Sequence, residues 1–109
     1  MATNYKVLGQ VAPAATTDTT AYTVPAATET VISTIFVCNR GTDASTYRIA
    51  VRPNGATLAN EHYIAYDVLI LGSTSTAITV GVTMDATDVL TVRSSSTALS
   101  FNVFGSELS

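Results

Sequence analysis

Residues 47–52 of this chain, Tyr-Arg-Ile-Ala-Val-Arg, decide its fold class, because their side chains alternate in polarity. Successive side chains of an extended strand point to opposite faces, so the apolar residues at 47, 49 and 51 would share one face. Arg48 and Arg52 would share the other. The same alternation recurs in residues 99–103, where Leu, Phe and Val are separated by Ser and Asn. Both segments therefore predict half-buried β-strands.

Two longer segments are apolar on both faces. Residues 31–38 and 63–71 are rich in Val, Ile, Leu and aromatic side chains. β-Branched residues, which are abundant throughout the chain, pack well on a pleated sheet and lose rotamer freedom in a helix. We therefore predict that both segments are central strands, with a core on one side and room for a neighbour on the other.

Turn signals divide the chain at intervals of about 8–12 residues, a spacing typical of β-sandwiches and barrels. Asn54-Gly55 is a strong turn pair because both residues tolerate a positive φ. Pro25 confines its segment to a strand end or a sheet edge, because proline cannot donate a hydrogen bond to a neighbouring strand. A helical turn is predicted within residues 54–61. The predicted strands are 5–11, 19–24, 30–39, 46–52, 62–70, 77–82, 88–93 and 98–104.

These signals together predict one all-β domain over residues 1–109. The expected architecture is an antiparallel two-layer β-sandwich of about eight strands, with the jelly roll as one topology that it could take. The immunoglobulin pattern is absent, since the chain has no Trp and no cysteine pair.

Composition and charge exclude several classes of function. Of the 109 residues 47% are apolar, enough for a core, and only 12% are charged, which indicates a surface of Thr, Ser and Asn or one covered by neighbouring subunits. The net charge of −3 offers no positive patch for nucleic acid. No apolar run approaches the ~20 residues of a membrane span. Residues 1–6 lack the pattern of a signal peptide, so synthesis and retention in a cytoplasm are expected.

Candidate catalytic and metal sites are few. His62, the single histidine, lies near Glu61 and Asp67, but no nucleophile-elbow pattern accompanies it. We interpret His62 as a half-buried residue hydrogen-bonded at a strand start, with a small hydrolase as the alternative. Asp85 and Asp88 could hold Ca²⁺, but Asp88 is more simply a turn-closing residue that accepts a backbone N–H. We therefore predict that the chain is not an enzyme and that it has no catalytic residue, metal or cofactor.

Five residues form the candidate interface: Arg40, Arg48, Arg52, Tyr63 and Tyr66. Arginine is enriched at protein interfaces because its planar guanidinium makes bidentate contacts. Arg48 and Arg52 could pair with carboxylates of this chain or of a neighbour, or be ordinary surface residues. The tyrosines could line a sugar-binding surface or belong to the core. Strict alternation would place Tyr63 and Tyr66 on opposite faces of their strand.

Two single residues carry further structural predictions. Cys38, the only cysteine, excludes an intrachain disulfide and is predicted to be a small buried hydrophobe. Gly81 lies inside a strand pattern, where a glycine indicates a bulge or a close approach of another backbone.

Residues 37–41, 47–56, 61–67 and 100–106 together carry a resemblance to a known group of proteins. These segments, which begin Val-Cys-Asn-Arg-Gly and end Ser-Phe-Asn-Val-Phe-Gly-Ser, resemble small virion structural proteins of tailed bacteriophages, including phages of cyanobacteria. The resemblance implies a capsid decoration (cement) protein that bridges shell subunits, or an accessory protein of the neck, tail or baseplate. It assigns no functional residue.

The resemblance also implies partners and a location. The partners would be copies of the chain itself, in a homo-oligomer, and other virion proteins such as major capsid or tail proteins. The protein would be assembled into the virion in the host cytoplasm. A receptor- or carbohydrate-binding module of a tail fibre, with Tyr63, Tyr66 and Arg48 as its binding face, is the alternative from another class.

Overall fold

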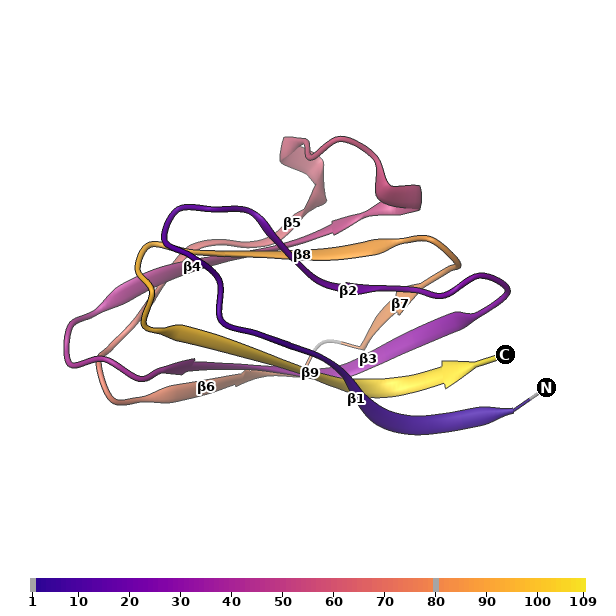
Figure 1. Ribbon diagram of the computed structural model, residues 1–109, viewed down its shortest axis with the longest axis horizontal. Helices are drawn as coiled ribbons and strands as arrows, with labels where there is room; N and C mark the ends of the chain where they lie inside the picture. Colours follow the sequence, from indigo (N-terminus) through magenta and orange to yellow (C-terminus); the bar gives the residue numbers. More distant parts are fainter. Residues whose placement is uncertain (1, 80) are drawn as a thin grey trace.

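The computed structural model describes residues 2–79 and 81–109, and strands account for 61% of it (Figure 1). Two short 3₁₀ turns, η1 (Pro53–Gly55) and η2 (Asn60–His62), supply the helical part. Within the described residues the strands are β1 (Thr3–Val11), β2 (Thr19–Thr23), β3 (Glu29–Asn39), β4 (Ser45–Arg52), β5 (Tyr63–Ile70), β6 (Ser75–Ile78), β7 (Val82–Met84), β8 (Val89–Ser94) and β9 (Leu99–Leu108).

The strands form two antiparallel sheets that pack face to face. Sheet 1 has the order β1-β9-β3-β6, and β7 also pairs with β3. Sheet 2 has the order β2-β8-β4-β5. Figure 1 shows the two layers, with both chain termini side by side at one end of sheet 1. The predicted all-β antiparallel sandwich is therefore confirmed.

The pairing of the strands defines a jelly roll. β1 pairs with β9, β2 with β8, β3 with β6 and β7, and β4 with β5. The first half of the chain thus runs antiparallel to the second half as one long hairpin. This hairpin folds over so that its successive strand pairs lie alternately in sheet 1 and sheet 2, which is the jelly-roll arrangement that the sequence left open.

One predicted strand is divided in two. Residues 77–82 were expected to be a single strand, whereas β6 and β7 are separate strands that both pair with β3. Val80 lies outside the described residues. Gly81 has a φ of +58°, a conformation that interrupts regular pairing, and no atom lies within 4 Å of a Cβ built on it. The sequence predicted a bulge or a close backbone approach at Gly81; instead Gly81 lies between two separate strands, and no backbone among the described residues approaches it closely.

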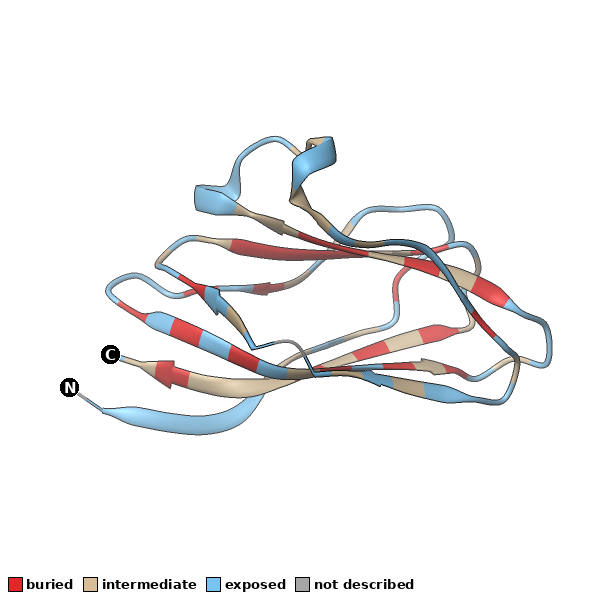
Figure 2. Cartoon of the chain, turned by 180° about the vertical axis from the view of Figure 1, so that it is seen from behind, coloured by how far each residue is buried: buried red, intermediate tan, exposed pale blue. Residues whose placement is uncertain are grey.

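The core lies between the sheets, and buried residues alternate with more exposed ones along β3 and the first half of β9, whereas β8 is buried almost throughout (Figure 2). The Phe101 ring packs edge-to-face on Tyr47, with 6.2 Å between ring centroids. The predicted inward positions of 47–52 and 99–103 are confirmed, with Val51 partly buried. The buried cluster consists of Tyr22, Val24, Ile32, Ile35, Val37, Tyr47, Ile49, Ile70, Met84, Leu90, Val92, Leu99, Phe101 and Val103.

A buried polar network ties the two sheets together at one end. Tyr22 reaches across from β2 and donates its hydroxyl to Glu107 Oε2 on β9 at 2.5 Å. The same hydroxyl lies 2.8 Å from Thr30 Oγ1 on β3, and Lys6 Nζ lies 2.7 Å from Glu107 Oε1. Burial and the bond to Glu107 raise the pKa of Tyr22 to about 12, while Lys6 and Tyr22 lower the pKa of Glu107.

The two segments predicted as central strands differ in the structure. β3 is central, between β9 on one side and β6 and β7 on the other. β5, in contrast, lies at the edge of sheet 2, so the prediction for residues 63–71 was wrong. Most of its large apolar residues stay exposed, with Ile70 buried in the core, because this jelly roll ends sheet 2 at β5, a consequence of topology that no local pattern reports.

Cys38 also departs from its predicted place. It is partly exposed on the outer side of sheet 1, because its neighbours Val37 and Asn39 face the core. Pro25 lies two residues after the end of the edge strand β2, as predicted. The single helical turn predicted within residues 54–61 is only partly confirmed: two 3₁₀ turns, η1 and η2, lie at the two ends of this range, and residues 56–59 between them are not helical. Figure 1 shows both turns projecting from the outer side of sheet 2.

Candidate functional site

Four side chains from β4 and β5 meet on the outer side of sheet 2: Arg48, Tyr63, Tyr66 and Asp67. We call them the Arg48 cluster. The register between β4 and β5 shifts twice, between Tyr47 and Ile49 and again before Ala50, so β5 carries extra residues. Asp67 takes a positive φ of 50°, which Asp tolerates better than most residues. The prediction that Tyr63 and Tyr66 lie on opposite faces is therefore wrong.

The Arg48 cluster is held by mutual contacts. Arg48 Nε donates to Asp67 Oδ1 at 2.7 Å and its Nη2 donates to Oδ2 at 3.2 Å, a bidentate pair. The Arg48 Cζ lies 4.1 Å from the Tyr66 ring centroid and 6.0 Å from that of Tyr63. The two tyrosine rings meet edge-to-face, 4.9 Å apart. Each side chain thus restricts the rotamers of the others.

Electrostatics keep the ion pair charged. The hydrogen bonds to Asp67 raise the pKa of Arg48, and those same bonds lower the pKa of Asp67. Both groups are consequently ionised at neutral pH. One carboxylate and one guanidinium, fixed beside an aromatic ring, could bind hydroxyl groups or another planar polar group.

A polar hollow of about 230 Å³ adjoins the ion pair. Arg93 lies on its wall, 3.6 Å from Asp18. Tyr66, whose ring lies against Arg48, is 56% exposed, so an aromatic face is available to a ligand. The residues that line the hollow are Thr16, Thr46, Arg48, Asp67, Arg93, Ser94 and Ser95.

The other two predicted interface arginines hold loops of their own chain. Arg40 Nη2 donates to the Thr97 carbonyl at 2.8 Å. Arg52 Nε donates to Thr91 Oγ1 at 3.0 Å, and its Nη1 donates to the Ala56 carbonyl at 3.0 Å. Arg48 alone of the three forms the predicted pair with a carboxylate of this chain.

His62 is hydrogen-bonded to the backbone of its own turn. It is half-buried at the end of η2, directly before β5, and its Nδ1 accepts the Ala59 N–H at 3.0 Å. The interpretation of this histidine as hydrogen-bonded at a strand start is confirmed.

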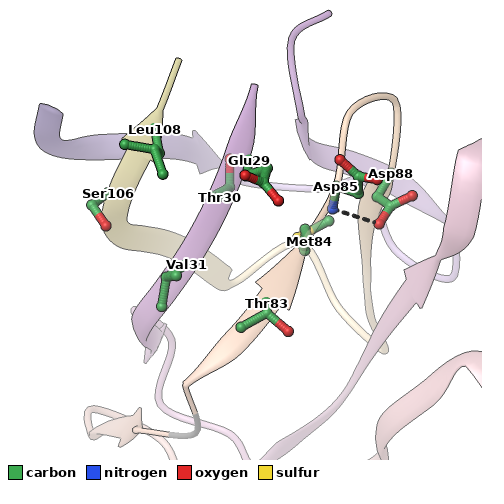
Figure 3. Close-up of a pocket in the computed structure, with 9 residues that line it drawn as sticks. All are labelled: Glu29, Thr30, Val31, Thr83, Met84, Asp85, Asp88, Ser106 and Leu108. Atoms are coloured by element: carbon green, nitrogen blue, oxygen red, sulfur yellow. Dashed lines mark hydrogen bonds between the residues drawn. The ribbon is translucent and has the colours of Figure 1, made fainter. Parts of the chain in front are cut away.

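Asp85 and Asp88 lie at a surface hollow of about 450 Å³ between β3, β7 and β9 (Figure 3). Asp88 Oδ2 accepts the Asp85 N–H at 2.9 Å, and its Oδ1 accepts the Asn54 N–H at 2.8 Å. Oδ2 therefore closes the turn before β8, as interpreted from the sequence, while Oδ1 binds the backbone of η1, far away in the chain. Among the residues that the structure describes, no group of three or more His, Cys, Asp or Glu is placed to hold a metal ion.

The outer side of sheet 1 is a second candidate surface, and the sequence did not indicate its extent. Tyr5 is 85% exposed and Phe36 is 41% exposed, and Val7 and Val31 are also exposed. Phe36 packs edge-to-face on Phe104, with 5.9 Å between ring centroids. We call this surface, made by Tyr5, Val7, Val31, Phe36 and Phe104, the apolar face. The one available signal was that residues 31–38 are apolar on both sides.

The register explains why these side chains gather. Tyr5 lies opposite Ser106, which lies opposite Val31, and Val7 lies opposite Phe104. The apolar face therefore spans β1, β9 and β3 without a charged side chain at these positions.

Comparison with protein-family models, with curated proteins and with solved structures found no match. In the described part of the chain, no helix has the length and apolar character needed to cross a membrane.

Proposed function

We propose that this chain is a non-enzymatic structural subunit of a tailed-bacteriophage particle. The most specific form of the proposal is a capsid decoration protein that bridges and stabilises neighbouring shell subunits. The observation that carries it is the apolar face. Large apolar side chains exposed together are typical of surfaces that bind other proteins, because their burial contributes roughly 25 cal/mol per Å².

Two further observations support this role. The jelly roll is a fold that viral capsid domains use, although lectins and cupins use it as well, so this support is an analogy of fold. The sequence resemblance to small phage virion proteins points to the same class. Placement in the neck, tail or baseplate would use the apolar face in the same way, with tail proteins as partners.

The proposal predicts binding to particles that were assembled without this chain. We expect the wild-type chain to co-sediment with such particles, and the double variant Tyr5→Lys, Phe36→Lys to lose at least tenfold in affinity, because two charges would be buried in an apolar contact. Quantitative co-sedimentation measures the affinity of each protein for the particles.

The control is Thr57→Lys, which adds one positive charge at an exposed position between η1 and η2 and is also compared with each single variant, Tyr5→Lys and Phe36→Lys. It should bind as the wild type does. Equal binding by the control and the double variant would contradict a role for the apolar face. The ratio of bound chain to major capsid protein separates the placements, since a comparable number of copies indicates the shell and a far smaller number indicates the neck, tail or baseplate.

The Arg48 cluster favours a second candidate function, a carbohydrate- or receptor-binding module. Sugars are bound in proteins by aromatic rings that stack on their C–H faces and by charged side chains that bind their hydroxyl groups. The exposed Tyr66 ring and the Arg48–Asp67 pair offer both kinds of contact next to a polar hollow.

For this second candidate we expect binding to at least one polysaccharide on a glycan array. Tyr66→Ala should weaken it about tenfold, because one aromatic contact contributes about 1.4 kcal/mol. Tyr5→Ala removes a still more exposed tyrosine from the other sheet and should leave glycan binding unchanged. Absence of binding above background, or equal losses in both variants, would count against this function.

A further inference from the structure

β5 is an edge strand with large apolar side chains left in solvent. Within the described residues it pairs with β4 alone. Leu69 on β5 is 63% exposed and Leu71, directly after the strand, is 61% exposed. Val68 is in register with the buried Tyr47, yet it remains 38% exposed, because nothing lies beyond this edge to cover it. An edge of this kind offers unpaired backbone groups and apolar contacts together.

The other sheet edges carry features that discourage pairing. β2 has only five residues and is followed by Pro25. β6 and β7 are short and separated at Gly81. β1 carries Lys6. Proteins commonly protect exposed edges with short strands, proline or lysine. β5 contains no Lys, Arg or Pro, and its sequence is Tyr-Ile-Ala-Tyr-Asp-Val-Leu-Ile.

We propose that a second copy of this chain binds here, with its β5 antiparallel to the first β5 about a twofold axis. The two four-stranded sheets would then join into one continuous sheet. A twofold interface places the same surface of both copies in contact, so it requires a self-complementary surface. The Val68–Leu71 segment is apolar throughout, and apolar side chains match copies of themselves.

Charge also favours a second copy. Asp67 is the only charged residue of β5, and Arg48 of the same chain already holds it through two hydrogen bonds. Two copies can therefore approach without an unpaired carboxylate at the contact. A twofold axis at Ile70 would set Leu69 of one copy opposite Leu71 of the other, and it would keep the two Asp67 carboxylates apart.

The extra residues of β5 limit the contact. Regular pairing with β4 is restored only from Val68 onward, so about four residues of each strand are available to the second copy. A dimer made through so short a segment depends on its leucine contacts. This interface uses sheet 2, so it does not require the proposed particle role, which rests on the apolar face of sheet 1.

The experiment is sedimentation velocity over a range of concentrations, with the full chain. We expect the wild type to pass from monomer to dimer, and Leu69→Lys and Leu71→Lys each to raise the dissociation constant at least tenfold. Tyr5→Lys, at a more exposed apolar position on sheet 1, should dimerise as the wild type does. Because all three positions are exposed, each variant should fold, which circular dichroism checks.

Hydrogen exchange gives a second readout that follows the backbone. Amides in residues 68–71 should exchange more slowly in concentrated than in dilute wild-type protein, and Leu69→Lys should abolish the difference. A wild type that stays monomeric at all concentrations would overturn the proposal. So would an oligomer that Tyr5→Lys dissociates and the leucine variants leave intact, since copies would then meet through the apolar face.

Discussion

Phe101→Ala should lower the free energy of unfolding by about 3–5 kcal/mol, the typical cost of removing a fully buried phenylalanine side chain. Phe101 lies on β9, a central strand of sheet 1, and it is fully buried between the sheets against the Tyr47 ring of sheet 2. Alanine would leave a cavity where the two sheets meet. The β-strands on both sides are fixed by their ladders, so the surrounding residues can fill the space only in part.

The same substitution at Phe36 is the matched control for Phe101. Phe36 is on β3 in the same sheet but faces outward, so Phe36→Ala loses the edge-to-face contact with Phe104 and creates no internal cavity. We expect a cost of about 1 kcal/mol. Equilibrium unfolding in urea, at a concentration where all proteins share one oligomeric state, measures both values. Equal losses would show that the space between the sheets is not the core described above.

Glu107→Gln should cost about 1–3 kcal/mol at neutral pH. The Glu107 carboxylate accepts from Tyr22 and pairs with Lys6, and its side chain is nearly buried. An amide keeps one acceptor and replaces the other with an N–H₂ donor, which would face the ammonium of Lys6 or the hydroxyl of Tyr22. In either orientation the neutral amide loses the ion pair with Lys6 inside the network that joins β1, β2, β3 and β9.

The effect of Glu107→Gln should depend on pH. Lys6 and then Tyr22 lower the pKa of Glu107 below its ordinary 4.5, so the unfolded chain takes up the proton at a higher pH than the folded chain does. The stability from this carboxylate is therefore fully present above pH 4.5 and is lost as pH falls through the folded pKa. The wild type and the Glu107→Gln variant should accordingly differ less at about pH 3 than at about pH 7.

The control for this pH dependence is Glu29→Gln, an exposed carboxylate on the neighbouring strand β3. At neutral pH it should change the free energy of unfolding by less than about 0.5 kcal/mol. Chemical denaturation of the wild type and of both variants, at each of the two pH values, gives the change in the free energy of unfolding for each variant at each pH. A Glu107→Gln variant whose deficit is the same at both pH values would contradict the role given to the ionised carboxylate.

The two outer sides of the sandwich differ in chemistry. The apolar face of sheet 1 lies on β1, β9 and β3, whereas Arg48, Asp67 and Arg93 lie on the outer side of sheet 2. Such a subunit has one side suited to a broad protein contact and another suited to polar ligands. The structural and the binding proposals thus concern separate surfaces, and their variants can be tested independently.

The sequence predicted the strands well because local patterns determine them. The strand at 30–39 was placed within one residue of β3, and that at 46–52 within one residue of β4. The inward residues at 47 and 49 of β4 follow from a period of two, since adjacent side chains of a strand point to opposite faces, whereas the inward side of β3 changes at the register shift between Ile32 and Thr34. His62 and Asp88 were likewise interpreted correctly, because their hydrogen bonds connect groups near in sequence or at turns.

The Arg48 cluster was only partly predictable. Arg48, Tyr63 and Tyr66 were selected as residues, but their meeting with Asp67 depends on the shifted register between β4 and β5 and on the positive φ of Asp67. A strict period of two puts Tyr63 and Tyr66 on opposite faces. A bulge breaks that period, and whether a strand bulges depends on the partner strand to which it must fit.

By itself, then, the sequence determined that this chain forms a sandwich of short antiparallel strands, and which side of most strands faces the core. Only the tertiary structure decided which strands are central and which are edges. Residues 31–38 and 63–71 have the same apolar character, yet β3 is paired on both sides and β5 on one. The physical reason is that side-chain alternation is a local property, whereas a strand's position in its sheet follows from pairing between segments far apart in the chain, and that pairing leaves Leu69 and Leu71 exposed.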